Sequence, residues 1–315
     1  MTGKNSPSFM IQTLGCKVNQ YDSERLRARL LRQGFRACSE GYGEPDLIIV
    51  NTCSVTSESD RKGRQLIRKL IRRYPQARVA VTGCYAERKP GDVLRISGVG
   101  EVVRIEDQEA WVQRVAEELG WGCADQDALW EPGEGIELFE EHTRAFVKIQ
   151  DGCDLKCTFC SIPQSRGAAR SRPLPEIVAE CATLVRGGYP EIVLCGICLG
   201  LYGQGADIRL PGLVRAVAEI EGIQRVRISS LEPQDVSDEL FAVMAERPEI
   251  VCPHLHLPLQ SGSNAILRRM KRPYTAEHFL ERVERARGLI PGFEVSTDIM
   301  VGFPGESEED FEQTL

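Results

Sequence analysis

The sequence has no apolar run approaching the ~20 residues that a bilayer-spanning helix requires. Its first ten residues, MTGKNSPSFM, lack the apolar core of a secretory signal peptide. It also lacks an excess of positive charge, because 39 Lys and Arg stand against 46 Asp and Glu, for a net charge of -7. These absences predict a cytoplasmic protein with no membrane partner. They also argue against non-specific coating of nucleic acid, which needs clustered Lys and Arg.

Histidine is scarce, with 4 residues in 315, whereas cysteine is abundant, with 12. In a long chain without an export signal, thiols stay reduced, and closely spaced cysteines point to metal binding or catalysis rather than to disulfides. The apolar fraction of 42% is enough to fill the cores of two domains. We therefore expect a globular protein of two domains with a function for some of its thiols.

Short apolar runs alternate with polar, periodic segments over about the first 120 residues, which is typical of a parallel sheet with crossover helices. The apolar runs are 9–14, 47–50 and 79–81, and the helical segments include 23–33 and 58–74. A loop with one cysteine follows each run: Cys16, Cys53 and Cys84. The carboxyl ends of parallel strands meet at one edge of a sheet, so the three cysteines could converge there as ligands. The alternative is that they only pack as small apolar side chains.

The alternation resumes after an acidic, glycine-rich stretch. Candidate strands lie at 145–150, 192–195, 226–229, 254–258 and 295–301, and candidate helices include 175–186 and 276–289. Five strands that alternate with helices predict an incomplete β/α barrel, whose active site lies at the carboxyl ends of the strands. We thus predict an α/β fold with a parallel α/β domain at 1–122, a linker at 123–143 and a partial (β/α) barrel at 144–315, truncated at its C-terminal end.

Three closely spaced cysteines, Cys153-x-x-x-Cys157-x-x-Cys160, directly follow the first barrel strand. Thiolates hold iron-sulfur clusters, and three of them leave one iron of a four-iron cluster open to a substrate or cofactor. The alternatives are a zinc site or three buried free thiols. Zinc sites usually pair Cys-x-x-Cys or include His, and no His lies nearby. The spacing favours iron.

Several segments together resemble the methylthiotransferases, a family of radical S-adenosylmethionine enzymes. They are TLGCKVNQYDSE, VNTCSVT, TGCYAE, VKIQDGCDLKCTFCSIPQSRG, SSLEP, HLHLPLQSGS and TDIMVGFPGE, and they extend over nearly the whole chain. The resemblance implies S-adenosylmethionine and two 4Fe-4S clusters as cofactors. It assigns one cluster to Cys153, Cys157 and Cys160, and the other to Cys16, Cys53 and Cys84.

The sequence around the first three cysteines resembles that of the family branch that modifies N6-threonylcarbamoyladenosine beside the tRNA anticodon. It implies insertion of a methylthio group at C2 of that base, position 37, by radical chemistry. This sequence lacks the motif GCQMN of the isopentenyladenosine branch and the motif GCPKN of the ribosomal-protein branch. Alternatives are methylthiolation of a ribosomal protein or of another tRNA base, a non-enzymatic iron-sulfur carrier or redox sensor, and an inactive fragment.

The resemblance also implies residues that contact S-adenosylmethionine. Gly187 and Gly188 match a glycine turn before the second barrel strand, where a backbone without Cβ allows close approach. Further candidates at strand ends are Ser229, Glu232, Gln260, Ser261 and Asp298. Each of these could instead be a turn residue or a cap.

The implied partners are the tRNA anticodon stem-loop and a reductant such as a flavodoxin-like or ferredoxin-like protein. Two basic segments are candidates for RNA contact. Residues 61–73 hold seven basic residues and no acidic one, although a solvated helix face explains them equally well. Arg166, Arg170 and Arg172 follow the cluster cysteines, and arginine forks suit phosphate.

Two features depart from the family pattern. Cys195 and Cys198 stand where the family more often has Thr and His, which is either a redox or metal pair or, as we favour, a simple substitution. The family also normally carries a C-terminal RNA-binding β-barrel domain, which is absent from these 315 residues, so the sequence resembles a fragment.

Overall fold

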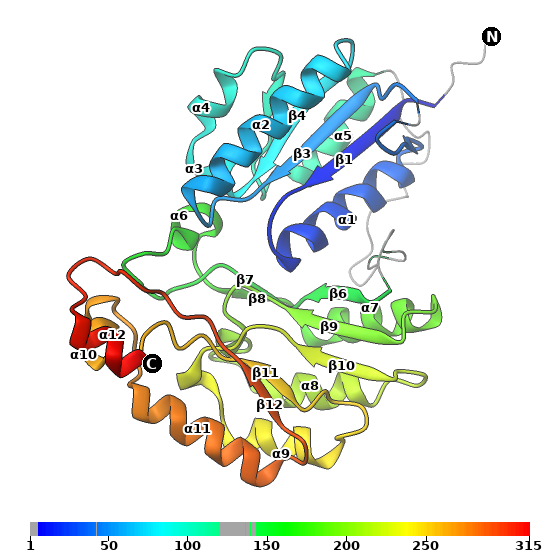
Figure 1. The fold of residues 1–315 in the computed structure, drawn as a ribbon. Helices are drawn as coiled ribbons and strands as arrows, with labels where there is room; N and C mark the ends of the chain where they lie inside the picture. Colours follow the sequence, from blue (N-terminus) through cyan, green and yellow to red (C-terminus); the bar gives the residue numbers. More distant parts are fainter. Residues whose placement is uncertain (1–5, 42, 120–135, 137–138, 140–142) are drawn as a thin grey trace. The chain divides into compact units, whose positions relative to one another are not determined.

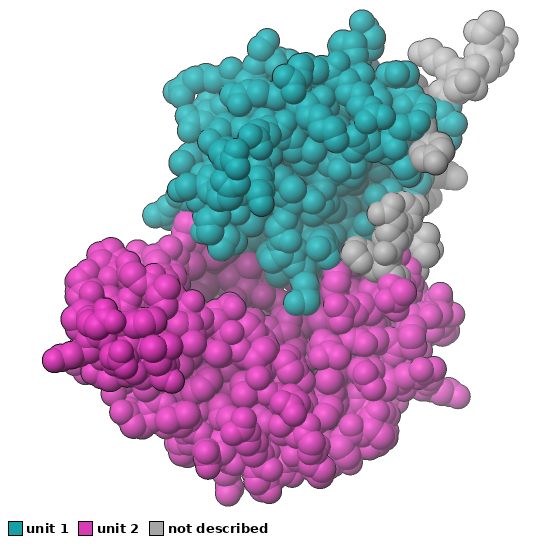
Figure 2. Space-filling model, in the orientation of Figure 1, with its two compact units in different colours: residues 1–136, 164–166 teal, residues 137–163, 167–315 magenta. Residues whose placement is uncertain are grey.

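The computed structural model describes residues 6–41, 43–119, 136, 139 and 143–315. The chain forms two compact units, residues 1–136 with 164–166, and residues 137–163 with 167–315 (Figure 2). The predicted linker at 123–143 lies largely outside the described residues. The domain limits 1–122 and 144–315 therefore stay a prediction.

The first unit is built on a five-stranded parallel sheet with the strand order β2-β1-β3-β4-β5 (Figure 1). The strands are β1 (Ser8–Thr13), β2 (Arg36–Ala37), β3 (Leu47–Thr52), β4 (Arg78–Gly83) and β5 (Glu101–Val102). The three long strands coincide with the three predicted apolar runs. The edge strands β2 and β5 have two residues each, which is too short to produce an apolar run.

Alternate residues of the central strands fill two separate cores, one on each face of this sheet. Ile11 and Ile49 pack with Leu26, Trp111 and other residues of one core. The neighbouring positions Ile48 and Val50 pack with Ile67, Leu70 and other residues of the second. The helices are α1 (Lys17–Arg32), α2 (Ser57–Arg73), α3 (Cys84–Arg88), α4 (Pro90–Leu94) and α5 (Gln108–Glu118). Because strands buried on both faces read as continuous apolar runs, this unit was recognisable from sequence.

The second unit contains five parallel strands that follow one another in space as they do in the sequence. These are β6 (Ala145–Lys148), β9 (Glu191–Cys195), β10 (Arg225–Ile228), β11 (His254–His256) and β12 (Glu294–Ser296). Strands β6, β9 and β10 form one ladder, β11 and β12 form another, and a parallel bridge from Ser230 to His256 links the two. This is the predicted partial barrel, and each of its five strands overlaps a predicted one.

The remaining elements of the described chain belong to the second unit, apart from residues 164–166, which belong to the first. They are the hairpin β7 (Gln150–Asp151) and β8 (Arg170–Ser171), the helices α6 (Ile162–Arg166), α7 (Leu174–Arg186), α8 (Leu210–Ala218), α9 (Asp238–Glu246), α10 (Asn264–Arg269), α11 (Ala276–Leu289) and α12 (Glu308–Thr314), and the 3-10 turns η1 (Leu199–Leu201) and η2 (Pro233–Asp235). Helix α11 begins where predicted because the side chain of Thr275 accepts a hydrogen bond from the His278 backbone and caps it. Within the described ranges, every helix is too short or too polar to cross a bilayer.

Candidate functional site

The loop of Cys153, Cys157 and Cys160 begins at a rigid anchor after β6 and β7. Gly152 has a φ of 71°, and a Cβ there would lie 2.0 Å from the carbonyl oxygen of Ala168. The position therefore requires glycine on both conformational and steric grounds. The next residue, Cys153, donates its backbone N–H to the Gly167 carbonyl at 3.1 Å. The backbone of Gly152 and Cys153 is thus fixed against the segment at Gly167 and Ala168, which sets the position of the first cysteine of the motif.

The three thiols of this loop share one neighbourhood in the second unit. A hydrogen bond from Cys198 lowers the pKa of Cys153 to about 7, against the opposing effect of burial. Burial raises the pKa of Cys160, and the charges of Cys157 and Cys153 raise it further. Two thiols close enough to affect the titration of a third are a soft donor set, which suits an iron-sulfur cluster.

These side chains are not gathered around one point. Across the described residues, no three His, Cys, Asp or Glu side chains are placed to hold a single metal ion. A four-iron cluster spreads its ligands over separate irons, so it needs wider spacing than one ion does. The donor set fits a cluster better than zinc, and the assignment of individual ligands stays a prediction.

A buried arginine from a distant segment lies against this cysteine loop. Arg272 donates from Nη1 to Cys157 Sγ at 3.1 Å and from Nε to Tyr274 Oη at 2.9 Å, and its Nη2 pairs with Glu232. Burial raises the pKa of Glu232, whereas the charge of Arg272 opposes that rise. Sequence analysis predicted Glu232 but missed Arg272 and Tyr274, because one buried arginine among the many of RRMKRPYT carries no local signal.

Gln150 joins the cysteine loop to the loop that follows β9. Its Oε1 accepts hydrogen bonds from the backbone of Ile197 at 3.1 Å and of Cys198 at 2.8 Å. Its Nε2 donates to the carbonyls of Asp151 at 2.9 Å and Gly152 at 2.8 Å. This bridge places the Cys198 thiol beside Cys153, and Cys198 Sγ lies 4.0 Å from Asp235 Oδ2.

Cys195 and Cys198 occupy different surroundings. Cys195 is the last residue of β9 and is 1% exposed, with its carbonyl bonded to the Ile149 backbone at 2.9 Å. Cys198 lies in the next loop and is 3% exposed. The structure thus gives Cys198 a thiol neighbour in the cluster motif, whereas Cys195 is part of the strand.

Five residues predicted to contact S-adenosylmethionine follow the carboxyl ends of β10, β11 and β12. They are Ser229, Glu232, Gln260, Ser261 and Asp298. Gln260 has a φ of 68°, and its backbone N–H donates to the Asp298 carbonyl at 2.8 Å, which continues the pairing of the last two strands. The five positions lie at the edge of the strands that also carries the cysteine loop.

Gly187 and Gly188 are not at that edge, and their predicted role needs correction. Gly187 ends α7, and both glycines precede β9, whereas the cysteine loop follows the carboxyl end of β6. Since β6 and β9 are parallel, the two glycines lie at the opposite, amino end of the strands. Gly188 has a φ of 96°, so these glycines serve to end a helix. Gly196, directly after β9, does lie at the carboxyl edge, and a Cβ there would lie 3.0 Å from the Gln150 carbonyl oxygen.

The second cysteine trio lies at the carboxyl edge of the first unit's sheet. Cys16 precedes α1, Cys53 directly follows β3, and Cys84 directly follows β4. Burial raises the pKa of Cys84, and the charges of Cys16 and Cys53 add to the rise, so the three thiols are electrostatic neighbours. They converge as expected, although their role as ligands stays a prediction.

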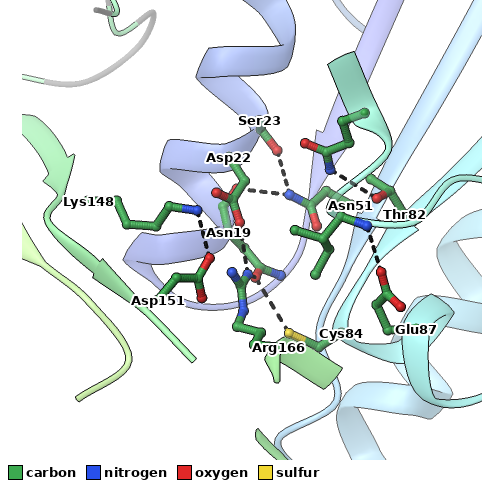
Figure 3. A network of polar contacts seen from close by, with 12 residues as sticks. Asn19, Asp22, Ser23, Asn51, Thr82, Cys84, Glu87, Lys148, Asp151 and Arg166 are labelled. Carbon is green, nitrogen blue, oxygen red and sulfur yellow. Dashed lines mark hydrogen bonds and ion pairs between the residues drawn. The ribbon is translucent and has the colours of Figure 1, made fainter. Parts of the chain in front are cut away.

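Asn19 ties the loops of this trio together. Its Nδ2 donates to the carbonyls of Leu14 at 2.9 Å and Thr52 at 3.0 Å, the residues just before two of the cysteine loops. Its Oδ1 lies 3.9 Å from Cys84 Sγ (Figure 3). Asn19, within α1, thus links the three cysteine loops.

The proposed phosphate-binding role of Arg166 and Arg172 is wrong. The Arg166 side chain, 1% exposed, donates from Nη2 to Asn19 Oδ1 at 2.7 Å and pairs with Asp22 at 2.9 Å (Figure 3). Arg172 pairs with Glu180, whose side chain is fully buried, at 2.7 Å. Both guanidinium groups are engaged by carboxylates of the protein itself, one of them fully buried. Arg170 remains exposed.

The basic segment 61–73 forms most of α2, and part of its charge is neutralised. Arg61 pairs with Glu58, while Lys69 and Arg73 both pair with Glu40. Leu70 and Ile67 face the core, as the amphipathic pattern predicts. The exposed cations Lys62, Arg68 and Arg72 lie on the other side of the helix. The solvated-face interpretation accounts for most of this segment.

Comparison with known proteins agrees with this geometry. Residues 147–315 match the family model of the Radical SAM superfamily, so the second unit defines the chain as a radical SAM protein. Residues 8–103 match the model described as "Uncharacterized protein family UPF0004". Among solved structures, the radical S-adenosylmethionine methyltransferase TsrM from Kitasatospora setae is similar, with a TM-score of 0.68 over 97% of this chain and 71% of that one. At 16% identity, that similarity supports the fold alone.

Curated relatives define the family further. The threonylcarbamoyladenosine tRNA methylthiotransferase MtaB of Bacillus subtilis is 39% identical, over 96% of this chain and 68% of the relative. The MtaB of Thermotoga maritima is 38% identical, over 97% of this chain and 70% of the relative. A tRNA-2-methylthio-N(6)-dimethylallyladenosine synthase of Thermobifida fusca is 37% identical, over 98% of this chain and 64% of the relative. The chain therefore belongs to the methylthiotransferase family of radical SAM enzymes. Membership implies S-adenosylmethionine and two 4Fe-4S clusters as cofactors.

Proposed function

We propose that this enzyme attaches a methylthio group to C2 of N6-threonylcarbamoyladenosine in the anticodon stem-loop of tRNA. The observation that supports it is the presence of two thiol trios, each at the carboxyl edge of a parallel α/β unit, in a chain related to the MtaB enzymes. One trio alone would serve an ordinary radical SAM reaction. The second trio gives the chain a place for the sulfur chemistry.

We further propose the ligands of the two clusters. Cys153, Cys157 and Cys160 would hold the radical SAM cluster, and Cys16, Cys53 and Cys84 would hold the other. When bound, the clusters and S-adenosylmethionine supply one-electron cleavage, sulfur and a methyl group, which no side chain can supply. The electron would come from a flavodoxin-like or ferredoxin-like protein, and a tRNA substrate supports a reaction in the cytoplasm.

The chain's own residues contribute position. Gln150 fixes the two loops beside the radical SAM trio to each other, and Asn19 does the same for the loops of the second trio. Holding the reacting groups in one geometry lowers the activation barrier, because their freedom of motion is already lost before the transition state forms. Ser229, Glu232, Gln260, Ser261 and Asp298 are the proposed contacts to S-adenosylmethionine, since they follow strands of the same parallel set.

The test separates the two trios. Cys157→Ala should abolish release of 5'-deoxyadenosine from S-adenosylmethionine, whereas Cys53→Ala should retain this release and form no methylthio product. Iron content should fall from about eight to about four per chain in either variant, as expected for two four-iron clusters. Cys38→Ala is the matched control, because Cys38 lies outside both trios, and it should behave as wild type. Equal release of 5'-deoxyadenosine by the two ligand variants would contradict the division of roles.

The substrate is tested with two RNAs of one sequence. One carries N6-threonylcarbamoyladenosine at position 37, and the other carries N6-dimethylallyladenosine. We expect the methylthio product, detected by mass spectrometry of nucleosides, on the first only. Product on the second RNA alone would assign the chain to the other tRNA branch. The Thermobifida fusca relative, which is 37% identical to this chain, carries the name of that activity.

A further inference from the structure

Arg272 is a buried arginine that contacts a cysteine sulfur in addition to the carboxylate that balances its charge. Its side chain is 3% exposed, and its guanidinium lies 4.9 Å from the ring centroid of Tyr274. Tyr274 Oη in turn donates to the Pro258 carbonyl at 2.7 Å, which fixes the ring. The planar fork is thus held in one orientation, with Nη2 directed at Glu232 and Nη1 directed at Cys157 Sγ. A carboxylate would satisfy the charge of Arg272, yet one N–H group is aimed at a sulfur.

That sulfur belongs to a proposed cluster ligand. Hydrogen bonds to ligand sulfurs and nearby charge are two of the factors that set the reduction potential of an iron-sulfur cluster. Reduction adds one electron and makes the cluster more negative, so a fixed cation in a buried site stabilises the reduced form. The electron comes from the protein reductant, and Arg272 keeps its protons throughout.

We propose that Arg272 is a positioning residue that raises the reduction potential of the cluster held by Cys153, Cys157 and Cys160. This inference rests on the ligand assignment proposed above. It assigns a role to a residue from the segment before α11, far in sequence from the cysteine motif. Arginine suits the role because its fork can serve Glu232 and Cys157 at once, which a lysine ammonium on a flexible stem does less well.

Cys198 provides an internal comparison. Its thiol is a neighbour of Cys153, another ligand of the same trio, and a neutral thiol is only a weak donor. A neutral donor lacks the charge that stabilises an added electron. Loss of Arg272 should therefore lower the reduction potential by more than loss of Cys198.

The experiment isolates one cluster. The background is the full chain with Cys16, Cys53 and Cys84 changed to alanine, so that only the radical SAM cluster is loaded. Iron and sulfide content is measured first. The potential is then measured by EPR-monitored titration without S-adenosylmethionine. If the background chain bound no iron, the proposed ligand assignment would be contradicted before Arg272 was tested.

Four variants are compared in that background. Arg272→Met and Arg272→Gln should both shift the potential to more negative values, and Cys198→Ala should shift it less. Arg247→Met is the matched control, because Arg247 is 42% exposed and pairs with Glu249 at 2.9 Å, and it should leave the potential unchanged. Arg272→Gln removes the charge but keeps a polar N–H donor on a shorter side chain, so it decides the result if Arg272→Met takes up no cluster.

Two results would overturn the proposal. One is a fully loaded Arg272→Gln variant whose potential equals that of the background chain. The other is a shift for Cys198→Ala as large as that for the Arg272 variants. Glu232→Gln adds a sign test, since removal of a negative charge beside the cluster should move the potential in the opposite direction. A shift to more negative values for Glu232→Gln would contradict the electrostatic effect on which the proposal rests.

Discussion

The ion pair between Arg172 and Glu180 gives the sharpest prediction for stability. Arg172 Nη1 donates to Glu180 Oε2 at 2.7 Å and to the Lys148 carbonyl at 2.9 Å. The Glu180 side chain is fully buried in α7, whereas the Arg172 side chain is 19% exposed. The two partners therefore differ in what happens when the other is removed.

Arg172→Met should lower the free energy of unfolding of the second unit by about 3 to 5 kcal/mol, because it leaves a buried carboxylate without its arginine. Glu180→Met should cost less, since Arg172 can turn toward water. The double variant should recover most of the loss, as a buried ion pair replaced by apolar side chains of similar volume is often close to neutral. The order of stability is then wild type and double variant, followed by Glu180→Met, with Arg172→Met last.

The assay must separate the two units. Trp111 is 3% exposed in the first unit, and in a Trp121→Phe, Trp130→Phe background its fluorescence reports that unit alone. Far-UV circular dichroism reports both units. Urea unfolding should show the shift by circular dichroism while the Trp111 transition stays unchanged. The reasoning is refuted if the two single variants lose equally or if the double variant loses the sum of both. Undiminished stability with weakened tRNA binding would restore the phosphate role for Arg172.

Two further predictions concern backbone geometry and pH. Gly152→Ala should lower the iron content of the radical SAM cluster, because a Cβ there would lie 2.0 Å from the Ala168 carbonyl oxygen and displace the start of the cysteine loop; Gly288→Ala, where a Cβ would meet nothing within 4 Å, is the control and should load normally. Burial raises the pKa of Glu101, but the combined effect of its neighbours, which include Arg114 and Arg78, outweighs burial and lowers the pKa below its usual value. Such a carboxyl contributes stability above its unfolded pKa of about 4.3, and this contribution is lost as the pH falls through the lower folded value. The wild-type urea midpoint should therefore fall more than that of Glu101→Gln between about pH 5 and pH 3, and equal slopes would contradict the effect.

The strand pattern and the cysteine spacing could be predicted from the sequence because both are local properties. Buried parallel strands such as β3 require a run of apolar residues, so 47–50 was visible without a structure. A cysteine after each strand end and the three cysteines after β6 are also read directly along the chain. Parallel topology then brings strand ends to one edge, which is why the two trios could be anticipated.

The residues around the cysteines were decided by tertiary structure alone. Arg272 reaches Cys157 across 115 positions of sequence, and no local pattern records such a contact. Arg166 and Arg172 were read as exposed phosphate ligands because sequence shows charge but does not show that Asp22 and Glu180 are buried beside them. Gly187 and Gly188, which precede β9, were assigned a contact to S-adenosylmethionine for a related reason. A glycine turn marks a chain reversal in any sequence, and only the strand direction tells whether that reversal lies at the amino or the carboxyl edge, where the chemistry of a parallel α/β unit is located.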